Sequence, residues 1–117
     1  MKDEALPELA ASLRVFAKER DWDQFHSPRN LAAALSVEAG ELLEHFQWMN
    51  DEQSESIAAE KKSEIALELA DVFLYLIRLA DQLDIDLIAS AKRKLKINAE
   101  KYPVERARGT SKKYTEL

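Results

Sequence analysis

Helix-breaking residues are scarce in this sequence, which has two glycines and three prolines among 117 residues. Folds made of many short strands need frequent turns, and glycine and proline are the residues that build most turns. A doubly wound α/β fold also needs glycine-rich turns between strand and helix, and the sequence has none. The sequence therefore predicts an all-α fold with the length of a single domain.

Hydrophobic residues recur at helical spacing in four segments, with short polar breaks between them. We expect helices at residues 6–20, 28–49, 55–82 and 86–101. Ser27 followed by Pro28 is typical of a helix start, and Pro103 stops the last helix. The fold class that these segments predict is a four-helix bundle.

Composition excludes several classes of protein. The formal net charge is −5, which argues against a protein that coats nucleic acid, so no stable nucleic-acid partner is expected. No cysteine is present, which rules out disulfides and thiolate metal sites. The first residues are acidic where a signal peptide is basic, and no apolar run approaches the ~20 residues of a membrane span. We therefore expect a cytoplasmic protein without membrane contact.

The two ends of the chain differ in character. Residues 1–104 are predicted to form a helical catalytic domain, and residues 105–117 a basic C-terminal tail that is mobile or straps a neighbour. Residues 65–77 are apolar nearly all round the helix, which indicates burial on most sides. Because one small bundle cannot cover so much apolar surface, we expect a homo-oligomer.

Four carboxylates lie inside the most apolar helical segments. Glu38 and Glu41 share a face of the second predicted helix, and Glu68 and Asp71 share a face of the third. If these faces meet, four anions repel one another strongly unless cations lie between them. Oxygen ligands without cysteine favour Mg²⁺, with Mn²⁺ as a substitute.

Two other interpretations of these carboxylates remain open at this point. They could form ordinary buried salt bridges with Arg29, Lys61 or Arg78. A di-iron bundle also uses inward carboxylates, but it requires a Glu-x-x-His pattern twice. His45 is four residues from Glu41, so that pattern is missing.

The order of these motifs resembles a known family. Glu38-Ala39-Gly40-Glu41 and, after 26 further residues, Glu68-Leu69-Ala70-Asp71 resemble the ExxE…ExxD signature of MazG-like all-α nucleotide pyrophosphohydrolases. The resemblance covers about residues 8–104 and is most specific to the dCTP pyrophosphatase branch. The other segments that carry it are residues 20–22, 25–31, 46–48, 71–76 and 94–103.

The resemblance implies an enzyme that hydrolyses a dNTP to a dNMP and pyrophosphate, a house-cleaning reaction that here favours dCTP or a modified dCTP. It implies Mg²⁺ held by Glu38, Glu41, Glu68 and Asp71. Glu41, beside Glu38, is the first candidate to take the proton of the attacking water. Glu44 and Glu64 are candidates to assist from outside the ligand set.

The resemblance also implies a nucleotide pocket and a tetramer made as a dimer of dimers. The residues implied in substrate binding are Trp22, His26, Trp48, Tyr75, Lys94, Asn98 and Lys101. Flat aromatic rings can stack on a base, although each ring could instead be an ordinary core residue. The last three residues share one stripe of the fourth predicted helix, where they could contact phosphates.

Two other functions remain as alternatives. A dUTP-type or broad-specificity nucleotide hydrolase would use the same helices and metal ligands. A non-enzymatic helical adaptor would explain the apolar helix faces, but it would leave the carboxylates embedded in them without a role.

Overall fold

The computed structural model describes residues 4–117, and every regular element in this range is a helix. The prediction of an all-α fold is therefore confirmed for this part of the chain. The chain divides into two compact units, Met1–Asp84 and Ile85–Leu117. Across residues 4–117, no helix combines the length and the apolar character that crossing a membrane requires.

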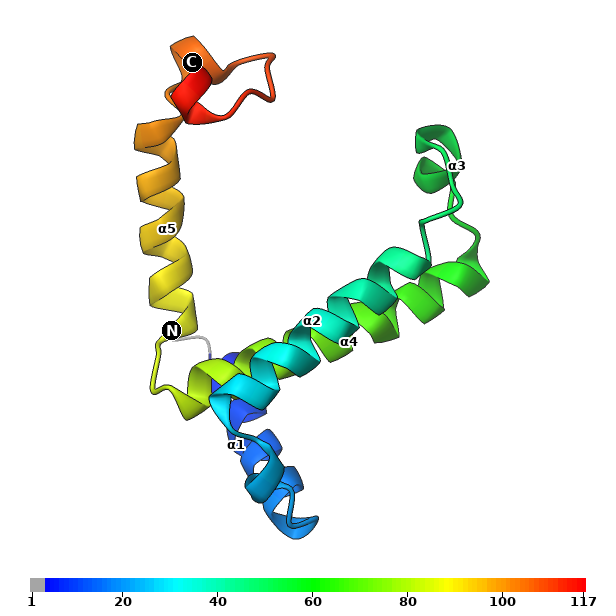
Figure 1. The fold of residues 1–117 in the computed structure, drawn as a ribbon, viewed down its shortest axis with the longest axis vertical. Helices are drawn as coiled ribbons and strands as arrows, with labels where there is room; N and C mark the ends of the chain where they lie inside the picture. The colour runs from blue at the N-terminus through cyan, green and yellow to red at the C-terminus, as the bar shows by residue number, and fades with distance from the viewer. Residues whose placement is uncertain (1–3) are drawn as a thin grey trace. The chain divides into compact units, whose positions relative to one another are not determined.

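The first unit is built on two long antiparallel helices. α2 (Pro28–Glu44) and α4 (Ala59–Gln82) run side by side, and α1 (Ala5–Glu19) packs against α4 (Figure 1). Two short helices, η1 (Asp23–Phe25) and α3 (Asp51–Glu55), lie in the connections. The carboxylates of the second and third predicted helices therefore lie on two helices that are adjacent in space.

The start of α2 has the predicted cap. The Oγ of Ser27 accepts a hydrogen bond from the backbone N–H of Asn30 at 3.2 Å, and Pro28 occupies the first helical position. The N–H of Asn30 is thereby paired although it lies too early in the helix for an intrahelical partner.

The predicted end of the second helix is wrong by five residues, because α2 stops at Glu44 instead of residue 49. The N–H groups of His45 and Phe46 bond to carbonyls three residues earlier, at 3.2 and 2.9 Å, so the helix tightens there and ends. Asn50 then starts a new helix, because its side chain and that of Gln53 bond reciprocally to each other's backbone N–H.

The third long helix was also predicted to begin too early. Residue 55 belongs to the short helix α3, and Ser56 leaves the helical conformation with φ −123° and ψ 53°. The helix α4 therefore begins at Ala59. Its predicted end at Gln82 is confirmed, and Asp84 follows in the left-handed conformation with φ 54°.

The second unit contains α5 (Leu87–Lys101), α6 (Val104–Ala107) and η2 (Tyr114–Glu116). Asp86 caps α5 by accepting the N–H of Ala89 at 3.0 Å, and the helix ends before the proline as predicted. The rings of Tyr102 and Tyr114 meet edge to face with centroids 5.9 Å apart. This contact ties the last residues to the end of α5, and the division into residues 1–104 and 105–117 stays a prediction.

Few large side chains are fully buried within the first unit. Leu31 of α2 and Ile77 of α4 are both 1% exposed. In contrast, Leu67 and Phe73 of α4 are 72% and 43% exposed. The expectation that residues 65–77 are buried on most sides is therefore not met within one chain.

Replacing Leu31 with alanine should destabilise the first unit strongly. The substitution removes buried methyl groups between α2 and its neighbours and leaves a cavity, so the free energy of unfolding should fall by about 2–5 kcal/mol. Urea unfolding followed by circular dichroism measures this loss. The matched Leu43→Ala, at a position 64% exposed on the same helix, should cost much less; equal losses would contradict the assigned core.

Candidate functional site

Three carboxylates converge between the two long helices. Glu38 and Glu41 lie one turn apart on α2, and Glu68 lies on α4. One carboxylate oxygen from each lies within 4.8 Å of the others. Glu38 and Glu68 are half-buried, and Glu41 is exposed. The antiparallel packing of α2 and α4 thus brings together three of the four acids that the sequence singled out.

The charges of these three groups are not neutralised by nearby cations. Within residues 4–117 no ion pair involves Glu38, Glu41 or Glu68, and one oxygen of Glu38, Oε2, is buried without a hydrogen-bond partner. The alternative of ordinary salt bridges fails for these three groups, because the contacts of Lys61 and Arg78 go to other acids.

Burial and mutual repulsion disturb the acidity of the cluster. Removal from water, followed by the proximity of Glu68 and Glu41, raises the pKa of Glu38 to about 7. Removal from water is also the largest cause that raises the pKa of Glu68. The hydrogen bond with Glu38 opposes this shift, and the proximity of Glu41 and Asp71 adds to it. Unpaired oxygen donors at this spacing fit a divalent cation such as Mg²⁺ or Mn²⁺.

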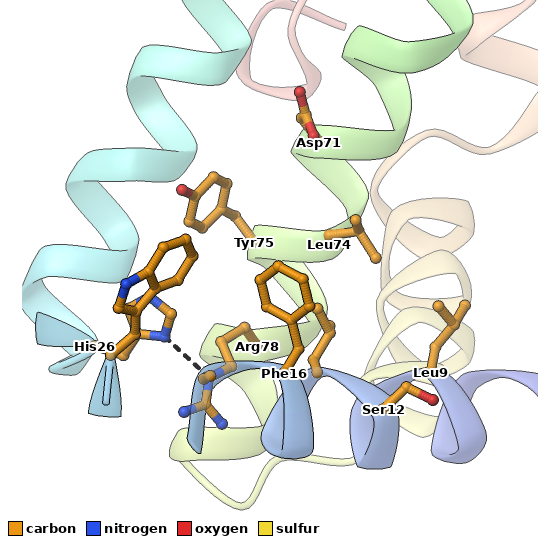
Figure 2. A pocket seen from close by; sticks show the side chains of 11 residues that line it. Leu9, Ser12, Phe16, His26, Asp71, Leu74, Tyr75 and Arg78 are labelled. Atoms are coloured by element: carbon orange, nitrogen blue, oxygen red, sulfur yellow. Dashed lines mark hydrogen bonds between the residues drawn. The ribbon is translucent and has the colours of Figure 1, made fainter. Parts of the chain in front are cut away.

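Asp71, the fourth predicted ligand, lies one turn beyond Glu68 on α4 but outside the group of three. Its side chain stands at the edge of a cavity, a turn away from Tyr75 (Figure 2). The charge of Asp71 acts on the pKa of Glu68, so the two carboxylates are electrostatically linked. Its role as a metal ligand stays a prediction.

The cavity has a volume of about 420 Å³ and is lined mainly by apolar side chains of α1 and α4. That volume lies within the usual range of small-molecule sites. Three of the aromatic residues predicted to bind substrate, Trp22, His26 and Tyr75, line it together with Asp71. The structure therefore places the carboxylate cluster and the aromatic cavity next to each other along α4.

Aromatic contacts position Trp22 on the wall of the cavity. The rings of Phe16 and Trp22 meet edge to face with centroids 5.7 Å apart, and Trp22 meets His26 in the same manner at 6.1 Å. Trp22 comes three residues after the end of α1 at Glu19 and directly follows Asp21, which has a left-handed backbone with φ 56°. Trp22 remains 42% exposed, so part of its ring is available to a ligand.

Arg78 is a cavity residue whose role the sequence analysis missed. Its side chain is only 7% exposed and forms an ion pair with Asp23 at 2.8 Å. The Nε of Arg78 also donates a hydrogen bond to Nδ1 of His26 at 3.3 Å. Burial first, and then the charge of Arg78, lowers the pKa of His26, while Asp23 opposes the shift. The sequence did contain a signal for this role: Arg78 lies in an apolar part of its helix, and a buried charge there requires a partner of opposite charge.

The remaining predicted residues do not line this cavity. Trp48 lies in the turn after α2 and is 87% exposed within one chain. Lys94, Asn98 and Lys101 belong to α5 in the second unit. Their predicted contacts with a nucleotide stay predictions.

The two candidates for an assisting base lie on exposed positions of α2 and α4. Glu44 is the last residue of α2, and Glu64 forms an ion pair with Lys61 at 3.5 Å. The ion-pair partner of Glu64 is thus a residue of the same helix. Neither residue belongs to the group of three carboxylates.

Comparisons with known proteins agree with this architecture. The MazG-like family matches residues 33–117. dCTP pyrophosphatase 1 of Rattus norvegicus is 47% identical over 104 residues, and that of Homo sapiens is 45% identical over the same length. Each alignment covers 87% of this chain and 61% of the relative, so the chain spans about three fifths of the length of these relatives.

A solved structure is similar as well. A crystal structure of a pyrophosphatase from Archaeoglobus fulgidus superimposes with a TM-score of 0.81 and 38% sequence identity. The match covers 88% of this chain and 96% of that protein. The all-α fold is therefore shared with a protein of similar extent.

Protons and divalent cations should compete for Glu38. Because its pKa is about 7 without metal, the carboxyl group is mostly ionised above that pH and mostly protonated below it. Mn²⁺ or Mg²⁺ affinity should therefore fall about 10-fold between about pH 8 and about pH 6, as calorimetry can measure. Glu38→Gln should weaken binding and remove this dependence, whereas Glu52→Gln on α3 should change neither; an affinity independent of pH would contradict the assignment.

Proposed function

We propose, because this chain belongs to the MazG-like family, that it hydrolyses a nucleoside triphosphate to a nucleoside monophosphate and pyrophosphate. The observation that carries the proposal is the group of three carboxylates without a cationic partner among the described residues, directly beside an aromatic cavity. The relatives named dCTP pyrophosphatase 1 favour dCTP, or a modified dCTP, as the substrate.

Charge determines how such a site can accept a triphosphate. Glu38, Glu41 and Glu68 would repel the phosphates, so the carboxylates must hold cations when the substrate binds. Mg²⁺ bound here would supply positive charge to the phosphates and increase the acidity of a nearby water molecule. Asp71 is proposed as a further ligand, because it extends the acidic face of α4 toward the cavity.

The reaction also requires an acceptor for the proton of the attacking water. Glu41 is exposed and adjoins Glu38 and Glu68, so we assign the proton transfer to Glu41, with Glu38 orienting the water. The oxygen of the water bonds to phosphorus while the anhydride bond between the α- and β-phosphates breaks. The bridging oxygen leaves with one product, and the water proton passes to the carboxylate.

The cavity is proposed to hold the base and sugar. Trp22 and Tyr75 provide aromatic surface, and His26 provides a polar group at the same wall. Lys94 and Lys101 are proposed to contact phosphates, because both are exposed cations on α5. Trp48 and Asn98 are proposed to contact the sugar or base. We expect this reaction in the cytoplasm.

Product analysis tests the proposed reaction. With Mg²⁺ and each dNTP in turn, we expect monophosphate and pyrophosphate in equal amounts, with dCTP turned over most efficiently. Stepwise release of single phosphates, or no turnover with any metal, would contradict the proposal. Efficient turnover of dUTP in place of dCTP would support the dUTP-type alternative.

Substitutions in the acidic cluster test the residues assigned to it. Glu38→Gln and Asp71→Asn should each lower kcat at least about 100-fold, because each removes a charge that holds the cations. The matched Glu52→Gln, at an exposed position of α3, should keep full activity. Circular dichroism checks that the helical content of each variant is unchanged. Normal activity of either cluster variant would remove that residue from the assignment.

The apolar surface of α4 supports the proposal of a homo-oligomer, with a tetramer built as a dimer of dimers. Leu67 and Phe73 are exposed within one chain, and a second chain would remove them from water. Light scattering should give a mass above that of the 13.4 kDa chain, and Leu67→Glu should shift it toward smaller species. A monomer at micromolar concentration would contradict this assembly.

A further inference from the structure

We propose that Arg78 is a positioning residue that fixes the tautomer of His26, so that the ring nitrogen not facing Arg78 carries a proton and can only donate a hydrogen bond. The identity of the ligand that accepts a hydrogen bond from this N–H group rests on the function proposed above. The tautomer itself is a property of the protein without ligand, and it can be measured without any turnover.

The direction of one hydrogen bond determines the tautomer. The Nε of Arg78 lies 3.3 Å from Nδ1 of His26. Figure 2 marks this hydrogen bond with a dashed line. A guanidinium group only donates hydrogen bonds and stays protonated in proteins. Nδ1 must therefore accept with its lone pair, which places the proton of the neutral imidazole on Nε2.

The guanidinium is held in place from its other side. Its NH2 group donates to Asp23 at 2.8 Å, and its NH1 group lies 4.0 Å from Asp81. Asp81 in turn accepts a hydrogen bond from Arg14 of α1 at 2.7 Å. Because the NH2 and NH1 groups of Arg78 face acids, its Nε is the group that faces the imidazole.

The charged groups around His26 also favour the neutral ring. Partial burial is the largest cause that lowers the pKa of His26, and the positive charge of Arg78 lowers it further. Asp23 acts in the opposite direction, but it forms an ion pair with the same arginine. Asp71 of α4 is a further charged residue in the cavity wall, whereas the residues of α1 that line the cavity are uncharged.

The backbone around the ring is fixed independently of Arg78. Gln82 of α4 donates to the carbonyl oxygen of His26 at 2.9 Å, and Asn30 of α2 donates to that of Phe25 at 3.0 Å. These bonds tie the segment before α2 to both long helices. Removing the guanidinium should therefore allow the imidazole proton to move between the two ring nitrogens and the ring to rotate, while the backbone keeps its place.

A fixed donor selects the ligand group that faces it. A carbonyl oxygen or an unprotonated ring nitrogen of a pyrimidine can accept from Nε2, whereas an N–H group there would meet a second donor. Such a mismatch leaves polar groups unpaired and weakens binding. Arg78 thereby contributes to base selection through His26.

Nitrogen NMR of the ligand-free protein tests the tautomer directly. The ring of His26 should show a protonated Nε2 and an unprotonated Nδ1 at neutral pH. Because the chain has two histidines, the spectrum of His45→Gln identifies the signals of His26. A proton on Nδ1, or a cationic ring at neutral pH, would overturn the proposal whether or not the protein hydrolyses nucleotides.

Arg78→Met tests the role of the arginine. We expect a mixture of both tautomers, a higher pKa of His26, and a KM for dCTP raised about 3- to 10-fold with kcat changed less than about twofold. Arg14→Met removes an exposed arginine from the same Asp81 and should leave tautomer, pKa and KM unchanged. An unchanged tautomer in Arg78→Met would refute the positioning role.

Asp23→Asn keeps the proposal testable if Arg78→Met does not fold. This change removes the negative charge while retaining Arg78, so the tautomer should persist and the pKa of His26 should fall further. Loss of the tautomer in Asp23→Asn would show that Asp23, and not Arg78, determines it. If no variant and no wild-type protein turns over dCTP, the proposed function fails while the NMR result still decides the tautomer.

Discussion

Repulsion among the carboxylates between α2 and α4 is the constraint on which the first unit depends. Hydrophobic packing around Leu31 and Ile77 holds the helices in place, although their acids repel one another. Removal from water, and then the proximity of Glu68 and Glu41, raises the pKa of Glu38, so protons and cations would compete for this carboxylate. Packing and metal binding therefore act on the same pair of helices, and bound metal would stabilise the arrangement that creates its site.

A single face of α4 connects the two halves of the site. Glu68, Asp71, Tyr75 and Arg78 follow one another at intervals of three or four residues, so their side chains lie along one stripe of the helix. The acidic end of the stripe suits cations, whereas the other end lines the aromatic cavity. Helix geometry sets the distance between the two ends, so α4 acts as a rigid spacer between the acidic group and the aromatic cavity.

Local signals carried most of what the sequence could predict. Apolar periodicity located the long helices, and Ser27-Pro28 located the start of α2. Carboxylates within apolar helices indicated a shared site, because helix geometry alone determines which side chains share a face. The end of α2 escaped prediction because the chain tightens at His45 and Phe46, where the apolar pattern does not change. The start of α3 had a local signal that was not used, the capping box of Asn50 and Gln53. The role of Arg78 at the cavity was missed because its hydrogen-bond partners, His26 and Asp23, lie more than 50 residues away in the sequence.

The small core of the first unit connects folding to concentration. Much of that core is alanine, including Ala10, Ala17 and Ala80, whereas larger side chains such as Leu67 lie on the outside of α4. If copies of the chain cover those side chains, part of the hydrophobic stabilisation is intermolecular and follows mass action. Dilution would then loosen α4 itself and, with it, the spacing of the acids it carries. Specific activity in such a protein would fall on dilution even though every chain keeps an intact covalent structure.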